Sequence, residues 1–207
     1  MIPFDTLLLF FAASAALALA PGPDNLFVLT QSALHGRLAG VVITLGLCSG
    51  LLVHTAAVAL GVAAVFQSSA LAFNGLKAVG AAYLLYLAWQ AFRAKPSGLA
   101  EEGGVDIRPG RLYRRGILMN VTNPKVAIFF LAFLPQFANP SAGSLTMQIL
   151  TLGGVFMLAA LIVFTAIAWA AGLIGERLKR SPRAQRTMNR LAGVVFAGLA
   201  LRLVLSR

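Results

Sequence analysis

Apolar residues recur along this chain in runs long enough to cross a lipid bilayer, which takes roughly 20 residues of helix. The hydropathy pattern predicts six spans, at 4–34, 38–65, 70–92, 116–137, 145–174 and 188–205. A transmembrane barrel would instead require alternating segments of about ten residues. We therefore expect an all-α, polytopic membrane protein in which residues 1–207 form a single transmembrane domain.

Proline and a charged residue interrupt two of these runs. The first run contains Pro21-Gly22-Pro23-Asp24-Asn25, and the fourth contains Asn123-Pro124-Lys125. Proline ends or kinks a helix, and the backbone groups that it frees must be buried in protein or line a watery cavity. We expect Gly22 to end one half-helix and Asp24 or Asn25 to cap the next. In the fourth run, Asn123 is a good N-cap and Pro124 a good first helical residue.

Composition supports the membrane class, and the loop charges predict an orientation. Hydrophobic residues make up 59% of the chain and charged residues 11%, against about 25% charged in soluble domains. The net charge of +11 would suggest nucleic acid in a soluble protein. Here thirteen Lys and Arg fall on one side of the spans and three on the other, which with Lys125 accounts for all seventeen. The positive-inside rule places the thirteen in the cytoplasm and both termini in the periplasm, and we expect no nucleic-acid partner.

A loop rich in Gly and Pro, residues 93–115, divides the predicted spans into two halves. It is the expected cytoplasmic linker between three spans at 4–92 and three at 116–207. Three spans per half invert the second half relative to the first, which is the inverted-repeat plan of many secondary transporters. The halves share the proline breaks and no further sequence identity, so the repeat is inferred from topology.

The two charges at the breaks are expected at similar depth. Asp24 lies ten residues before Leu34, and Lys125 lies nine residues after Gly116. At about 1.5 Å per residue both are roughly 15 Å deep, near the middle of a ~30 Å core, where a charge marks a functional site by default. Helix N-termini and Lys125 favour a carboxylate, while Asp24 suits an ammonium or a coupling proton. The alternative is that Asp24 is only a cap, Lys125 its counter-ion, and the breaks packing kinks.

Other polar residues within the spans are candidates for the same cavity. Asn25 belongs to the first break, and Asn120 lies one turn before the second. Thr44, His54 and Thr55 of the second span could border the cavity, or could simply hydrogen-bond a neighbouring helix. His54 could also carry protons. Four further aromatic residues, Tyr83, Tyr86, Trp89 and Trp169, are either an interface belt or pocket walls.

The sequence contains no enzyme signature that we could identify. It lacks the metalloprotease, serine-hydrolase and phosphate-loop motifs, and its single cysteine, Cys48, excludes an intramolecular disulfide. We expect neither a cofactor nor a bound metal. A metal-ion exporter is an alternative, although it would need clustered carboxylates, His or Cys, and Asp24 is the only carboxylate deep in a span. A non-transporting membrane subunit and a passive channel are further alternatives.

The two breaks also carry a family resemblance. Residues 21–26, the Gly36-Arg37-x-x-Gly40 pattern, residues 120–127 and the tail at 189–199 resemble the LysE/RhtB family of bacterial amino-acid exporters, essentially end to end. The resemblance implies six spans, export of an amino acid across the inner membrane by exchange with protons, and a homodimer in the bilayer. The family's break residues carry over onto Pro21, Gly22, Pro23, Asp24, Asn123, Pro124 and Lys125. Which amino acid is carried stays open, although the near-cancellation of Asp24 and Lys125 favours a zwitterion.

Overall fold

The computed structural model describes residues 2–20, 22–68, 70–93 and 108–179, together with scattered residues between 186 and 204. These residues form helices and no strand. Pro21, most of the predicted linker and half of the predicted last span lie outside the described residues. The helices are α1 (Phe4–Leu19), α2 (Pro23–His35), α3 (Arg37–Ser68), α4 (Ala70–Arg93), α5 (Pro109–Val121), α6 (Pro124–Ile128) and α7 (Leu145–Lys179). A π-helical turn, η1 (Phe129–Phe133), and two 3-10 turns, η2 (Leu134–Phe137) and η3 (Pro140–Ala142), connect α6 to α7.

The all-helical class is confirmed, and both predicted breaks are present. The axes of α1 and α2 differ by 63°, and the axis of α5 differs by 50° from that of the helical stretch at Pro124–Phe137. Within the described residues, α3 and α7 are long and apolar enough to cross a membrane, and each bent pair could add one more span. The six-span count and the inverted repeat therefore stay predictions.

The fourth helical run begins earlier than predicted. We expected a start at 116, whereas α5 begins at Pro109. Proline suits the first helical position because its missing N–H would be unpaired there in any case. Buried Leu112 and Gly116 then give this first part of the helix an inward face.

Glycines allow α3, α5 and α7 to approach closely. A Cβ atom added to Gly46 would lie 2.2 Å from the carbonyl oxygen of Tyr113, and one added to Gly116 would lie 2.6 Å from that of Ile43. Gly50 faces the Asn120 side chain in the same way. Small residues at such positions let membrane helices pack backbone against backbone. The contact between α3 and α5 thus fixes the end of α5, where Asn120 lies.

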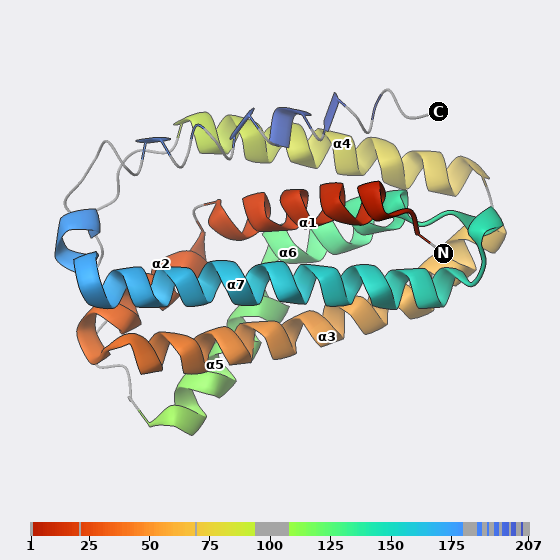
Figure 1. The fold of residues 1–207 in the computed structure, drawn as a ribbon. Coiled ribbons are helices and arrows are strands. Elements are labelled where there is room, and N and C mark those ends of the chain that lie inside the picture. Colours follow the sequence, from red (N-terminus) through yellow and green to blue (C-terminus); the bar gives the residue numbers. More distant parts are fainter. Residues whose placement is uncertain are drawn as a thin grey trace.

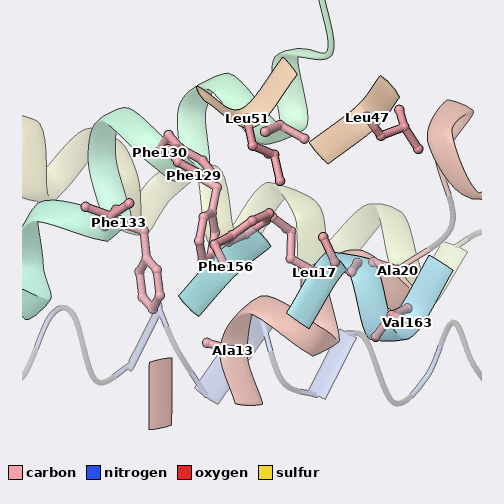
Figure 2. Close-up of a cluster of buried hydrophobic side chains, with 14 of the residues drawn as sticks. Ala13, Leu17, Ala20, Leu47, Leu51, Phe129, Phe130, Phe133, Phe156 and Val163 are labelled. Atoms are coloured by element: carbon pink, nitrogen blue, oxygen red, sulfur yellow. The ribbon is translucent and has the colours of Figure 1, made fainter. Parts of the chain in front are cut away.

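The helices pack around an aromatic core. Figure 1 shows α7 running between α1 and α3, and α7 packs against both, with α4 beyond α1 in this view. Phe129, Phe130 and Phe156 meet in the core, with ring centroids of Phe129 and Phe130 at 5.4 and 4.9 Å from that of Phe156 (Figure 2). Leu17 of α1 and Leu51 of α3 lie beside this cluster. The core therefore borders the ends of the half-helices directly.

Candidate functional site

The first break joins α1 to α2 with the chain extended at Gly22. Gly22 is the N-cap of α2, with φ −175° and ψ 176°, and Pro23 is the first helical residue. The prediction that Asp24 or Asn25 caps α2 is therefore wrong, as is the prediction that Gly22 ends α1, whose C-cap is Ala20. The reason is Pro23, which favours the first helical position and keeps the residue before it extended.

Asp24 consequently lies inside the first turn of α2. Its side chain is 2% exposed, and the positive end of the helix dipole stabilises a carboxylate at this position. Asn120 Nδ2, from the last turn of α5, donates to Asp24 Oδ2 over 3.5 Å. The other carboxylate oxygen, Oδ1, has no hydrogen-bond partner among the described residues.

The second break is capped as predicted. Asn123 is the N-cap of α6, its Oδ1 accepts a hydrogen bond of 3.0 Å from the backbone N–H of Lys125, and Pro124 follows as the first helical residue. The backbone N–H of Asn123 donates to Asn120 O at 3.0 Å, which ties the start of α6 to the end of α5. Residues of the break itself therefore cap α6 and tie it to the end of α5.

Lys125 joins the second break to the first. Its Nζ donates to the carbonyl oxygens of Leu17, at 3.1 Å, and Ala20, at 2.9 Å. The Asn25 side chain donates to Ala18 O in the same turn. The last carbonyls of a helix lack partners within the helix, and they attract a cation because of the helix dipole. Lys125 and Asn25 thus cap the carboxyl end of α1.

Asp24 and Lys125 share one small cavity. Asp24, Asn120 and Lys125 line it together with apolar residues that include Leu17 and Phe156. The two charged side chains make no direct ion pair, because the ammonium is bound by the carbonyls of α1. The break residues of the two half-helix pairs therefore meet in space, which the sequence predicted only through their matching depth.

A larger cleft lies on the other side of Lys125. Its volume is about 680 Å³. Gly22, Asn123 and Lys125 line it at the breaks, and α4 lines it with Tyr83, Tyr86, Trp89, Gln90 and Arg93. The sequence left the α4 aromatics open between an interface belt and pocket walls. In the structure Tyr83, Tyr86 and Trp89 line the cleft, and Tyr86 and Trp89 are also about half exposed. Gln90 and Arg93 were missed, although the spacing from Tyr83 to Arg93 follows one helical face and could have revealed them.

The lower-ranked polar candidates on α3 occupy different positions. Thr44 and Thr55 each bond a carbonyl one turn back in their own helix, and neither lines the two cavities above. His54 Nε2 lies 3.1 Å from Asn120 O, and its ring lies 5.6 Å from that of Phe130. Since a carbonyl can only accept, Nε2 is the donor. His54 of α3 thus binds a backbone carbonyl in the last turn of α5.

Comparison with known proteins assigns the chain to a family. The model of the LysE type translocator matches residues 15–207. This chain belongs to the LysE type translocator family. It is 34% identical over 200 residues to a homoserine/homoserine lactone efflux protein of Salmonella typhimurium, with 93% of each chain covered. It is 30% identical over 191 residues to a leucine efflux protein of an Enterobacter species, with 90% of this chain and 89% of the relative covered.

A further relative, an uncharacterized membrane protein of Vibrio cholerae, is 32% identical over 201 residues, which is 97% of each chain. No solved structure matches. Membership of the LysE type translocator family makes this protein a membrane transporter and not an enzyme. It also confirms the family resemblance carried by the two proline breaks.

Proposed function

We propose that this protein exports an amino acid, or a close derivative of one, across the bacterial inner membrane in exchange for protons. The observation that carries the proposal is the meeting of the two breaks. A carboxylate, an amide and an ammonium from Asp24, Asn120 and Lys125 line one small cavity, of about 10 Å³, beside helix ends of both polarities. These groups are complementary to the two ends of a zwitterion.

The bonds of Lys125 suggest how the site takes up its substrate. The Leu17 and Ala20 carbonyls now hold the Lys125 ammonium, and they could equally hold the ammonium of an amino acid. Lys125 would then turn to the substrate's carboxylate. The exchange keeps every charge paired, which a low-dielectric site requires.

Asp24 is the residue that we assign to proton coupling. It is the buried carboxylate of the site, and its Oδ1 is free to accept a proton or a substrate ammonium. A proton on Asp24 would weaken its hold on the substrate's ammonium, so that protonation and substrate binding compete. Competition of this kind is what an exchanger needs.

The direction of opening follows from the predicted orientation. The cleft runs along α4 from Tyr83 to Arg93, and Arg93 belongs to the predicted cytoplasmic side. Arg37 and Arg93, both on that side, stack on Trp169 and Trp89 at 4.3 and 4.7 Å. The cleft would thus receive substrate from the cytoplasm. The inverted repeat, with both termini in the periplasm, would supply the reciprocal state in which the site opens outward.

A counterflow assay in proteoliposomes tests the proposal. We expect a labelled amino acid to exchange across the vesicle membrane. The flux should rise when a proton gradient drives protons in the direction opposite to amino-acid export. Asp24→Asn and Lys125→Ala should each abolish exchange while the protein still inserts. Asp5→Asn, which neutralises an exposed carboxylate at the start of α1, is the control and should transport normally.

Two outcomes would contradict the proposal. A wild-type flux that does not change with the pH gradient would contradict exchange with protons and favour a passive channel. No flux for any amino acid would favour a non-transporting subunit or a different cargo such as a metal ion. Among the described residues, no three His, Cys, Asp or Glu side chains gather as a metal site would require.

A further inference from the structure

One face of α4 forms an aromatic and polar surface along the cleft. We call it the α4 wall, and it consists of Tyr83, Tyr86, Trp89, Gln90 and Arg93. Ring centroids of Tyr83 and Tyr86 lie 6.0 Å apart, and those of Tyr86 and Trp89 lie 6.2 Å apart. Gln90 Nε2 donates to Tyr86 Oη, and the Arg93 guanidinium stacks on Trp89. Each of these side chains thus contacts its neighbour along α4.

The opposite side of the cleft is formed by the two breaks. Gly22, Asn123 and Lys125 line it there. The gap therefore separates a group suited to a substrate carboxylate, the Lys125 ammonium, from a surface suited to a side chain. The volume of about 680 Å³ falls within the ~300–1,000 Å³ typical of small-molecule sites.

The charges around the cleft are all of one sign. Lys125 and Arg93 are both cationic, and none of the described lining residues is acidic. Asp24 lines the enclosed space on the other side of Lys125 and not the cleft. A substrate with a cationic side chain would meet two like charges in the cleft and, among the described lining residues, no carboxylate to pair with. Specificity often rests on such a repulsive element.

We propose that the α4 wall is the side-chain subsite of the transporter, and that it selects amino acids with an uncharged side chain over basic ones. This inference rests on the proposed function. Aromatic rings give an apolar side chain a large contact area. The Tyr hydroxyls and the Gln90 amide can bond a hydroxylated one, so that both kinds of uncharged side chain fit.

The test measures selectivity in the same counterflow assay, with labelled leucine and with lysine as competitor. Trp89→Ala should raise the leucine concentration for half-maximal exchange by about tenfold, because an aromatic contact is lost. Gln90→Glu places a carboxylate in the cleft without a change of shape. It should improve competition by lysine relative to unlabelled leucine by about tenfold. Leu85→Ala, an exposed residue of α4 that does not line the cleft, is the matched control and should leave both values unchanged.

The outcomes separate the inference from the function on which it rests. Wild-type exchange of leucine, with unchanged selectivity in Gln90→Glu and Trp89→Ala, would overturn the inference and leave the proposed function standing. In that case the α4 aromatics, of which Tyr86 and Trp89 are 47% and 52% exposed, serve as an interface belt. Wild-type preference for lysine over leucine would also overturn the inference. No exchange of any amino acid would overturn the proposed function and the inference together.

Discussion

The two helix breaks bind the unpaired backbone groups of their half-helix ends in different ways. At the second break, Asn123 caps α6, and the end of α5 is held by Thr122, by the Asn123 N–H and by His54. At the first break, the N-cap of α2 is Gly22, which offers no side-chain cap, and the end of α1 is held by Asn25 and by Lys125 from the other break. The second break is capped by its own residues with His54 of α3 in support, while the first depends on the Lys125 ammonium.

This difference predicts that a ligand can displace the cap of the first break more readily than that of the second. A cap supplied from its own turn stays in place whatever the rest of the molecule does. A cap supplied by a flexible lysine from another half-helix can be exchanged for a ligand with the same chemistry. The comparison therefore predicts that changes which disturb Lys125 affect transport more than changes to the local caps.

The largest effect is expected from Lys125→Met. The substitution keeps the length of the side chain but removes the donors to Leu17 O and Ala20 O, and each unpaired group costs about 1–3 kcal/mol. Transport should fall by at least about a hundredfold, and the melting temperature in detergent should drop. Lys125→Arg keeps a charged donor and should retain most of the stability. Full transport by Lys125→Met would show that the first break does not depend on this lysine.

A reciprocal exchange of Asp24 and Asn120 should come next in size. The two side chains are hydrogen-bonded at 3.5 Å, so a purely pairwise role would survive the exchange. Their helix positions differ, however. Asp24 lies at the positive start of α2, and Asn120 lies at the negative end of α5, where a carboxylate is disfavoured by about 0.3–1 kcal/mol. We therefore expect Asp24→Asn combined with Asn120→Asp to stay inactive in the counterflow assay. Recovery of transport in the double variant would mean that transport needs the carboxylate–amide pair but not a particular helix position for each partner.

The contrast between the breaks also marks what the sequence could predict. Asn-Pro-Lys carries its own cap and first helical residue, so the second break was predicted correctly from neighbouring residues. At the first break the dominant residue is Pro23, because of which the cap of α2 is Gly22 and not Asp24 or Asn25 as expected. The bonds from Lys125 to α1 join residues more than a hundred positions apart, and no local pattern encodes them. The α4 wall was ambiguous for the same reason, since only packing separates a lipid-facing aromatic from a cleft-facing one.

Gly22→Ala should produce an intermediate effect. The backbone at Gly22 is extended, so that any residue could adopt it, but an added Cβ would lie 3.1 Å from Lys125 Nζ. The lysine must shift by a few tenths of an ångström, which we expect to lower transport several-fold at a cost below about 1 kcal/mol in stability. Gly61→Ala is the control, because nothing lies within 4 Å of its added Cβ. Equal transport rates for the two variants would contradict a close fit between Gly22 and Lys125.

The smallest effect is expected at the locally completed break. Asn123→Ala removes the cap of α6 and should cost about 1 kcal/mol. Asn123→Ser keeps a capping oxygen and should recover that stability to within a few tenths of a kcal/mol, which melting curves in detergent would show. Asn139→Ala is the matched control, because Asn139 caps η3 with the same geometry in an exposed position. It should lose similar stability and transport normally. If Asn123→Ser regains stability but not transport, the amide of Asn123 has a second role in the site, and the two breaks are more alike than their caps indicate.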